Sequence, residues 1–279
     1  MATTSLSFNE IAGAASIDFA ASYATDYTNL KQVLNAANWQ VLPVGTALQT
    51  RAVSATLQDG NVNEAAEITA STFTRATTLT ALTYKKYRAL VGFETIQTAG
   101  LPAVAHEDAV LRAKIQGDLK GIFAAALTQT GTTAATGTTF QAACANAWAA
   151  LNTARDGYAS TPVFFCSPTT AAGYLGTANI TMQTAFGLSY LTNFLGMGTL
   201  IVVPGLTNAK VYATAQENLV IASADVQGIG AGFTTDESGI VAVKHAPKDE
   251  NAAMQIVVLG GAAVVPEFLS HIIVATISA

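Results

Sequence analysis

Two stretches of alternating apolar and polar residues early in the chain predict one long β-hairpin. The first covers Val44–Leu57, and the second, rich in threonine, covers Thr72–Thr83. Alternation with a period of two is typical of strands, and threonine favours them. The tripeptide Asp59–Asn61, with its central glycine, is a strong turn signal. Such a hairpin is on the order of 40 Å long and marginally stable alone, so it needs a surface on which to lie.

Apolar residues at steps of three and four predict a long helix from about Ala105 to Thr128. We expect this helix to start after Pro102, with Asp108 solvated in its first turn, where an acid complements the helix dipole. Asp108 and Arg112 have the i,i+4 spacing of an ion pair. The apolar positions are Leu111, Ile115, Leu119, Ile122, Phe123 and Ala126.

Helix and strand patterns alternate in the next part of the chain, after a Gly/Thr-rich stretch at 131–139. A helix is predicted over Phe140–Ala154, and Ser167 before Pro168 predicts an N-cap followed by proline at the first helical position. Short strands are predicted at Val163–Cys166, Thr199–Val203 and Lys210–Thr214, and closing strands at Ile240–His245, Gln255–Leu259, Ala262–Val265 and His271–Ile277.

This order of elements predicts an α+β fold in four parts. Residues 1–41 form an extended or partly helical arm that packs on neighbouring subunits, and residues 42–83 form the extended hairpin loop. The closing strands need the strand after the hairpin as a partner, which makes the first domain discontinuous, with residues 84–131 and 226–279. Residues 132–225 form a second domain.

The composition leaves this chain with few charges to cover its outside. Hydrophobic residues make up 51% of the chain and charged residues only 11%, against about 25% in ordinary soluble domains. Much of the surface must therefore contact a membrane or other copies of the chain. The most apolar stretch, Ile256–Phe268, contains Gly260, Gly261, Pro266 and Glu267 and is too short to span a bilayer. With no signal peptide visible either, we expect extensive self-contact and no membrane.

The charge balance argues against a protein that reads nucleic acid. The formal net charge is −5, whereas nucleic-acid readers usually carry a basic patch. A mild negative charge suits a container whose wall does not grip DNA. The densest positive cluster, Lys85, Lys86 and Arg88, is interpreted as a solvated strand end or a salt-bridged interface.

No constellation of catalytic residues is visible. The chain lacks G-x-S-x-G, P-loop, H-E-x-x-H and C-x-x-C motifs. His106, His245 and His271 lie in separate elements without metal-ligand spacing. We interpret Trp148 as a packing anchor and Cys144 as a buried thiol. The sequence therefore predicts no catalytic, metal or cofactor residue and no enzyme activity.

Several passages, taken in order, resemble the major capsid proteins of tailed bacteriophages, which have the Hong Kong ninety-seven (HK97-like) fold. NEAAEITASTFTRATTLTALTYKKYRALVGFETIQTAG (63–100) resembles the return limb of that family's extended loop, and HEDAVLRAKIQGDLKGIFAAALTQTG (106–131) resembles its spine helix. TPVFFCSPTTAAGYL (161–175), YLTNFLGMGTLIVVPGL (190–206) and KVYATAQENLVIASAD (210–225) are similar to its axial domain, and GGAAVVPEFLSHIIVATIS (260–278) to its closing strands.

The resemblance implies an N-terminal arm, an extended loop, a peripheral domain with the spine helix, and an axial domain. It also implies pentamers and hexamers in an icosahedral head that encloses double-stranded DNA, a virion component assembled in the host cytoplasm. The expected partners are further copies and a portal protein. Because the arm begins almost at Met1, the resemblance also implies a separate scaffolding protein or none, and a decoration protein is compatible with this arrangement.

Contacts between subunits are expected from the hairpin and the basic cluster. Some family members crosslink through a lysine of the extended loop, but residues 44–83 contain no lysine, so we expect no covalent crosslink. The predicted contact residues are Arg51, Asp59, Asn61, Glu64, Glu67, Arg75, Lys85, Lys86 and Arg88.

Three other functions compete with a phage capsid. An encapsulin-like compartment has the same fold but holds a protein cargo, and the sequence barely distinguishes the two. A tail tube or surface layer would be dominated by strands, so the long amphipathic helix counts against it. An enzyme with an unrecognised site fits poorly with the sparse charge and the scattered histidines.

Overall fold

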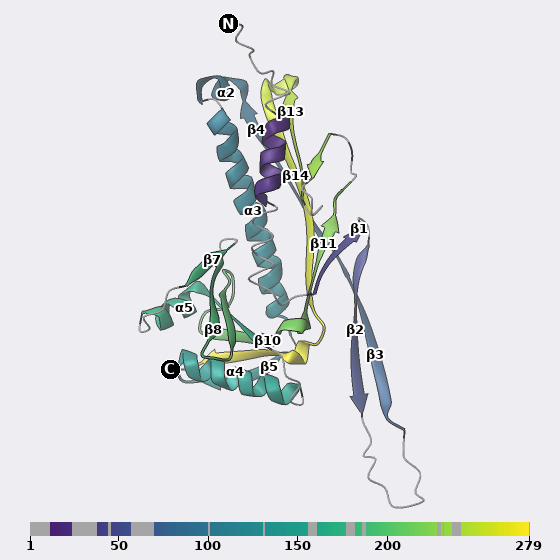
Figure 1. The fold of residues 1–279 in the computed structure, drawn as a ribbon, viewed down its shortest axis with the longest axis vertical. Coiled ribbons are helices and arrows are strands. Elements are labelled where there is room, and N and C mark those ends of the chain that lie inside the picture. Colours follow the sequence, from purple (N-terminus) through teal and green to yellow (C-terminus); the bar gives the residue numbers. More distant parts are fainter. Residues whose placement is uncertain are drawn as a thin grey trace, which may run out of the picture.

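Two β-sheets and a long helix form the body of the protein, and a two-stranded hairpin extends from it (Figure 1). The structure is a computed structural model. It describes residues 12–23, 38–43, 46–56, 70–99, 101–130, 132–155, 161–176, 182–185, 188–227, 230, 232–235 and 241–278.

The first sheet, which we call the peripheral sheet, is built around the long strand β14 (Ala253–Pro266). Antiparallel partners of β14 are β13 (Val241–Lys248), β4 (Thr83–Gly92) and β11 (Leu219–Asp225). Parallel to β11 lies β1 (Asn38–Pro43), and antiparallel to β13 lies β12 (Thr234–Thr235). Side chains of β14 alternate between the two faces of the sheet, and Met254, Ile256 and Val258 are fully buried on one of them.

The prediction of separate strands at Gln255–Leu259 and Ala262–Val265 is wrong, because β14 runs through both without a break. A Cβ atom on Gly261 would lie 3.0 Å from the Cβ of Ala224 and 3.0 Å from the ring of Tyr84. Glycine therefore serves close packing at this position, and not a turn.

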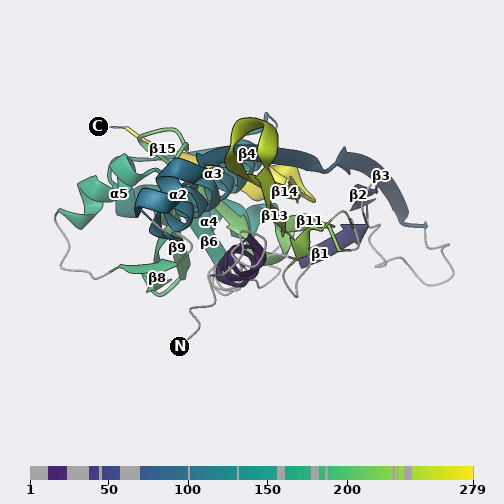
Figure 2. The same cartoon turned by 90° about the horizontal axis from the view of Figure 1, so that it is seen from above.

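Helix α3 (Leu101–Leu127) lies along one face of the peripheral sheet, which we call its inner face, and is preceded by α2 (Phe93–Ala99) (Figures 1 and 2). It begins four residues earlier than predicted. Pro102 stands in its first turn, where the missing N–H has no helical acceptor to lose. Leu111 and Ile115 pack into the core beneath the peripheral sheet, whereas Phe123 and Leu127 pack into a core shared with the second sheet.

Residues 12–23 form a helix that lies beside α3 on the same sheet (Figure 1). Ala12, Phe19, Ala20 and Tyr23 are at most 4% exposed and join the core that contains Leu111. The arm is predicted to pack on neighbouring subunits, and the structure shows that these residues pack on their own chain. Small or aromatic residues every three to four positions form the stripe that docks there.

The second sheet, which we call the axial sheet, has the strand order β5-β15-β10-β6-β9-β8-β7. Its strands are β5 (Thr133–Gly137), β6 (Pro162–Cys166), β7 (Gln183–Ala185), β8 (Leu188–Phe194), β9 (Gly198–Val202), β10 (Lys210–Ala215) and β15 (Ile272–Ile277). Helix α4 (Phe140–Ala154) buries one face against it, and α5 (Pro168–Leu175) follows β6. The predicted cap of α5 is confirmed, because the hydroxyl of Ser167 accepts a hydrogen bond from the Thr170 N–H at 3.2 Å.

After α3 has carried the chain from the peripheral sheet to the axial sheet, the chain crosses between the sheets twice more, and at these two later crossings the strand pairing differs from the predicted segments. Strand β11, whose residues fall in the segment 132–225 predicted as the second domain, pairs in the peripheral sheet. Strand β15, predicted within residues 226–279, pairs in the axial sheet. The crossings are the short helices η1 (Gln216–Asn218) and η3 (Leu269–His271).

Asn218 joins the two crossings and is 3% exposed. Its Nδ2 donates to the Thr214 hydroxyl at 2.9 Å and to the Phe268 carbonyl at 3.0 Å, and its Oδ1 accepts from the Phe268 N–H at 2.9 Å. Where the sheets meet, this side chain therefore uses both protons of its amide group and one of the two lone pairs of its oxygen.

Two further expectations fail. Asp108, expected to be solvated, is 8% exposed, and its Oδ1 lies 2.9 Å from Nε2 of His245. Trp148, expected to be a packing anchor, is 41% exposed, because the buried stripe of α4 runs from Phe140 to Leu151 through Ala147. As for a membrane, none of the described helices combines the length and the apolar character needed to cross one.

His271 in η3 gives the junction of the sheets a dependence on pH. Burial and the nearby Arg155 guanidinium lower the pKa of His271, so the folded chain binds a proton less readily than the unfolded chain. The contribution of His271 to stability is therefore complete above the ordinary histidine pKa of about 6.5 and falls as the pH drops below it.

We expect thermal melts at pH 7.5 and pH 5 to show a smaller acid-induced loss of melting temperature for His271→Gln than for the wild type. The exposed His106→Gln variant is the control, and an equal loss in all three proteins would contradict this role.

Candidate subunit interface

The hairpin consists of β2 (Ala47–Thr56) and β3 (Thr72–Ala81), which among the described strands pair only with each other. At its base Leu48 and Leu82 are 2% and 6% exposed and pack against the peripheral sheet. Farther out, Leu79 on β3 is 69% exposed. Because an isolated pair of strands is marginal in water, this arm gains stability by lying on another surface.

The face of β4 that points away from α3 carries two cations between two apolar groups. We define this outer-sheet surface by Tyr84, Lys86, Arg88 and Leu90, all of which are exposed. Lys244 of β13 and Arg88 of β4 both pair with Val257 of β14, one on each side of it. The Nζ atom of Lys244 lies 5.9 Å from the ring centre of Phe233.

Within the part of the chain that the structure describes, ion pairs do not neutralise the charge of Lys86 and Arg88. Tyrosine and arginine are enriched in protein interfaces, and an exposed aromatic beside exposed cations is a composition suited to binding an acidic segment. The outer-sheet surface is thus a candidate for contact with an acidic partner.

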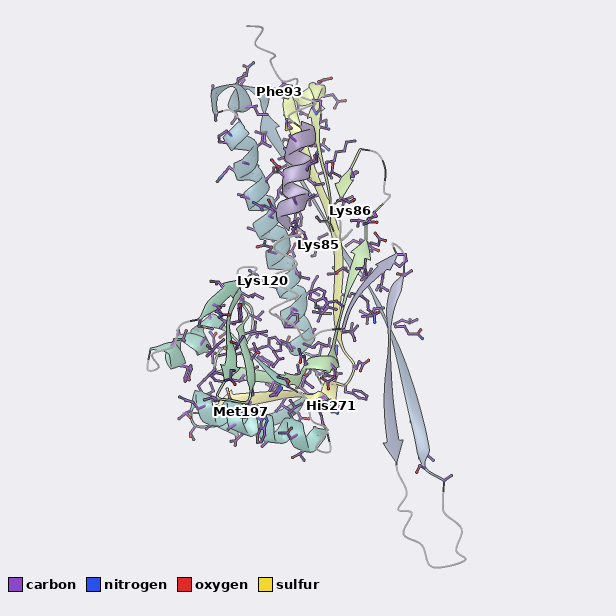
Figure 3. The ribbon with its side chains drawn as sticks, viewed as in Figure 1. Lys85, Lys86, Phe93, Lys120, Met197 and His271 are labelled. Atoms are coloured by element: carbon purple, nitrogen blue, oxygen red, sulfur yellow. The ribbon has the colours of Figure 1, made fainter. Side chains whose placement is uncertain are left out.

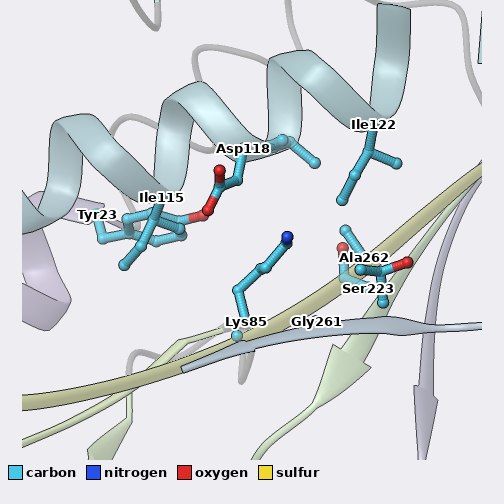
Figure 4. Close-up of a pocket in the computed structure, with 11 residues that line it drawn as sticks. Tyr23, Lys85, Ile115, Asp118, Ile122, Ser223, Gly261 and Ala262 are labelled. Carbon is cyan, nitrogen blue, oxygen red and sulfur yellow. The ribbon is translucent and has the colours of Figure 1, made fainter. Parts of the chain in front are cut away.

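Lys85 does not belong to the outer-sheet surface, although Figure 3 places it beside Lys86 along the strand. Strand alternation turns its side chain to the inner face, into a cavity of about 30 Å³ beneath α3. There it extends toward Asp118, with Tyr23 and Ile115 among the lining residues (Figure 4). Lys114 also reaches Asp118, at 3.5 Å from its Oδ1.

The other predicted contact residues fall in the hairpin. Arg51 pairs with Thr77 and Arg75 with Val53 in the β2–β3 ladder. The polar tip with Asp59, Asn61, Glu64 and Glu67 lies outside the described residues.

Sequence reasoning missed two exposed apolar groups on the axial side. Trp148 projects from α4, and Leu195, which is 44% exposed, stands in the turn between β8 and β9. Leu195 has φ 51° and Asn193 has φ 53°, a left-handed backbone that is uncommon for leucine. A helical wheel of α4 would have put Trp148 at the edge of the buried stripe, but no local signal marks Leu195.

The described residues also offer little to nucleophilic or metal chemistry. They contain no group of three or more His, Cys, Asp and Glu side chains placed to hold a metal ion. Burial raises the pKa of the Cys166 thiol to about 12 and raises that of Cys144 as well, with Cys166 adding to the effect. Both thiols are therefore protonated and unreactive at neutral pH.

Comparisons by sequence give no relative: no family model and no curated protein matches the chain. Solved structures do match along most of its length. The virus-like particle from Pyrococcus furiosus superposes with a TM-score of 0.54 at 11% identity, covering 90% of this chain and 96% of that one.

Two further matches have other origins. The mature capsid of bacteriophage PhiM1 gives a TM-score of 0.50 at 9% identity, covering 86% of this chain and 85% of its own. The encapsulin SrpI from Synechococcus elongatus gives 0.50 at 12% identity, covering 88% and 86%. At such identities the likeness concerns the fold alone.

Proposed function

We propose that this chain, which has the HK97-like fold of phage capsids and encapsulins, is a self-assembling shell subunit. The hairpin and the outer-sheet surface carry this proposal. Among the described strands the hairpin strands pair only with each other, and the side chains that define the outer-sheet surface are exposed. In a closed shell each would be covered by another copy. The low charge content of 11% fits a subunit that buries much of its surface in such contacts.

More specifically, we propose a major capsid protein that forms the pentamers and hexamers of a phage head around double-stranded DNA. Its further partners would be a portal protein, a separate scaffolding protein and, in some assemblies, a decoration protein. A net charge of −5 suits a wall that encloses DNA without gripping it.

An encapsulin-like compartment is the second candidate, favoured by the match to SrpI. The contents of purified particles distinguish the two functions. Nucleic acid inside supports a phage head, whereas a co-purifying protein cargo supports a compartment.

We further propose that the hairpin tip of one subunit binds the outer-sheet surface of another. Residues 57–71 contain three acids, Asp59, Glu64 and Glu67, and no lysine or arginine. The outer-sheet surface contributes the opposite charge through Lys86 and Arg88. Complementary charges of this kind set partner choice and register more than affinity.

The distance that residues 57–71 can span indicates that this contact forms between copies and not within one copy. Thr72, at the far end of β3, and Lys86 are fourteen residues apart on a strand path interrupted only at Leu82, or about 45 Å when extended. Half of the segment 57–71 spans about 25 Å at most. The acids of a subunit therefore fall short of their own Lys86 and Arg88.

Negative-stain electron microscopy of the purified chain, beside its sedimentation profile, tests the shell. We expect closed icosahedral particles, or capsomer-sized rings that close when a scaffold is supplied. Because no lysine lies in residues 44–83, particles dissolved in SDS should run as single chains of 28.7 kDa. A stable monomer or dimer under every condition would contradict a shell subunit.

Deletion of residues 58–72 tests the hairpin. None of the described side chains of this segment belongs to the hydrophobic cores of the folded body. We therefore expect the deletion variant to be a soluble subunit with an unchanged melting temperature. It should no longer close shells. Normal assembly of the deletion variant in the same microscopy would show that the tip is dispensable.

Charge reversal tests the contact between tip and outer-sheet surface. We expect Lys86→Glu with Arg88→Glu to abolish assembly, because like charges then face each other, and Glu64→Lys with Glu67→Lys to restore it in the same chain. Lys114→Gln, which removes a surface cation at a side chain that is 61% exposed on α3, is the control and should assemble. Assembly of the reversed variant would exclude the surface, and failure of the rescue would exclude the tip as its partner.

A further inference from the structure

A buried chain of hydrogen bonds joins three elements that are far apart in the sequence. His245 on β13 contacts the hydroxyl of Ser16, in the N-terminal helix, through Nδ1 at 2.9 Å, and the Asp108 carboxylate, on α3, through Nε2 at 2.9 Å. The three residues are 6%, 3% and 8% exposed, respectively. The same three elements also contribute apolar side chains to the core beneath the peripheral sheet, among them Phe19, Leu111 and Val243.

The contacts of Ser16 indicate how the protons are placed. Its hydroxyl donates to the Ala12 carbonyl at 2.9 Å and accepts from the backbone N–H of His245 at 3.1 Å. A hydroxyl has one proton, so it can then meet Nδ1 only as an acceptor. Nε2 faces a carboxylate oxygen and donates to it as well. All four contacts are hydrogen bonds together when His245 is an imidazolium paired with ionised Asp108.

The apolar contacts of the N-terminal helix do not define where it docks. Its inward residues are Ala12, Ser16, Phe19, Ala20 and Tyr23. A shift by one turn would bring Tyr23 to the place of Phe19 and Ser16 to that of Ala12. Each exchange keeps a small residue small and an aromatic residue aromatic, so burial alone barely separates the two registers.

Ser16 is the position at which the two registers differ. A shift by one turn would put Ala20 opposite His245 and leave the ring nitrogen and the backbone N–H buried without an acceptor. Buried groups that lose their partners cost about 1–3 kcal/mol each. Fixing a register is also the best-attested role of buried polar groups.

We propose that Ser16, His245 and Asp108 form a latch that fixes the register of the N-terminal helix on its own subunit. The helix then has two discrete states: docked with the latch closed, or released with His245 and Asp108 open to water. This inference concerns the single subunit and stands whether or not the chain builds shells.

Hydrogen–deuterium exchange of the full-length chain tests the latch. We expect Ser16→Ala to speed exchange in peptides from residues 12–23 by roughly five- to a hundredfold, with peptides from α3 and β14 unchanged. Ser22→Ala, the same change on a half-buried residue of the same helix, is the control and should leave the rates near wild type. Unchanged rates in Ser16→Ala, or equal acceleration in α3 and β14, would overturn the latch.

A pair of double variants with identical composition tests the register. Ser16→Ala with Ala20→Ser moves the hydroxyl one turn along the inward stripe, so a shifted helix can close the latch again and regain protection. Ser16→Ala with Ala21→Ser moves it to an exposed position and should exchange as fast as Ser16→Ala. Equal rates in the two double variants would exclude a role in register.

Discussion

Helix α3 contributes side chains to two separate cores, and the relative position of everything else follows from this. Leu111 and Ile115 are buried beneath the peripheral sheet, while Phe123 and Leu127 are buried where the axial sheet begins. Burying each such side chain is worth about 1.5–3 kcal/mol, so the sheets cannot separate without exposing one end of the helix. The outer-sheet surface and the hairpin base are thereby held at fixed places on one rigid support, with Asn218 securing the crossings.

Features set by local periodicity could be predicted from the sequence. The alternation that predicts the hairpin and the three- to four-residue steps of α3 each involve neighbours in the chain, as does the Ser167 cap. The continuity of β14 could not be predicted, because Gly260 and Gly261 look like a turn until Tyr84 and Ala224 are known to press against the strand. The crossings at η1 and η3 depend in the same way on pairing between distant strands, which no local pattern encodes.

The candidate interface was predicted unevenly for a related reason. Strand alternation separates Lys85 from Lys86, a distinction that their adjacency in the sequence conceals. Asp108 has the spacing of a solvated helix residue, and its partner His245 is 137 residues away. Ser16 is 229 residues from the same histidine. A buried polar chain of this kind becomes visible only when the fold brings three elements together, and the contacts expected of the hairpin tip stay predictions.

The distribution of the few charges indicates that apolar and charged residues have different roles in the subunit. Within one copy, apolar burial supplies the stability and ion pairs are few among the described residues. Opposite charges are instead separated along the sequence, because the acids at 59–67 fall between β2 and β3 and the cations Lys86 and Arg88 belong to β4. Under the proposed assembly, that separation makes electrostatic complementarity a property of the contact between copies. Apolar residues such as Leu79, Trp148 and Leu195 would then supply affinity, while the sparse charges select the register in which copies meet.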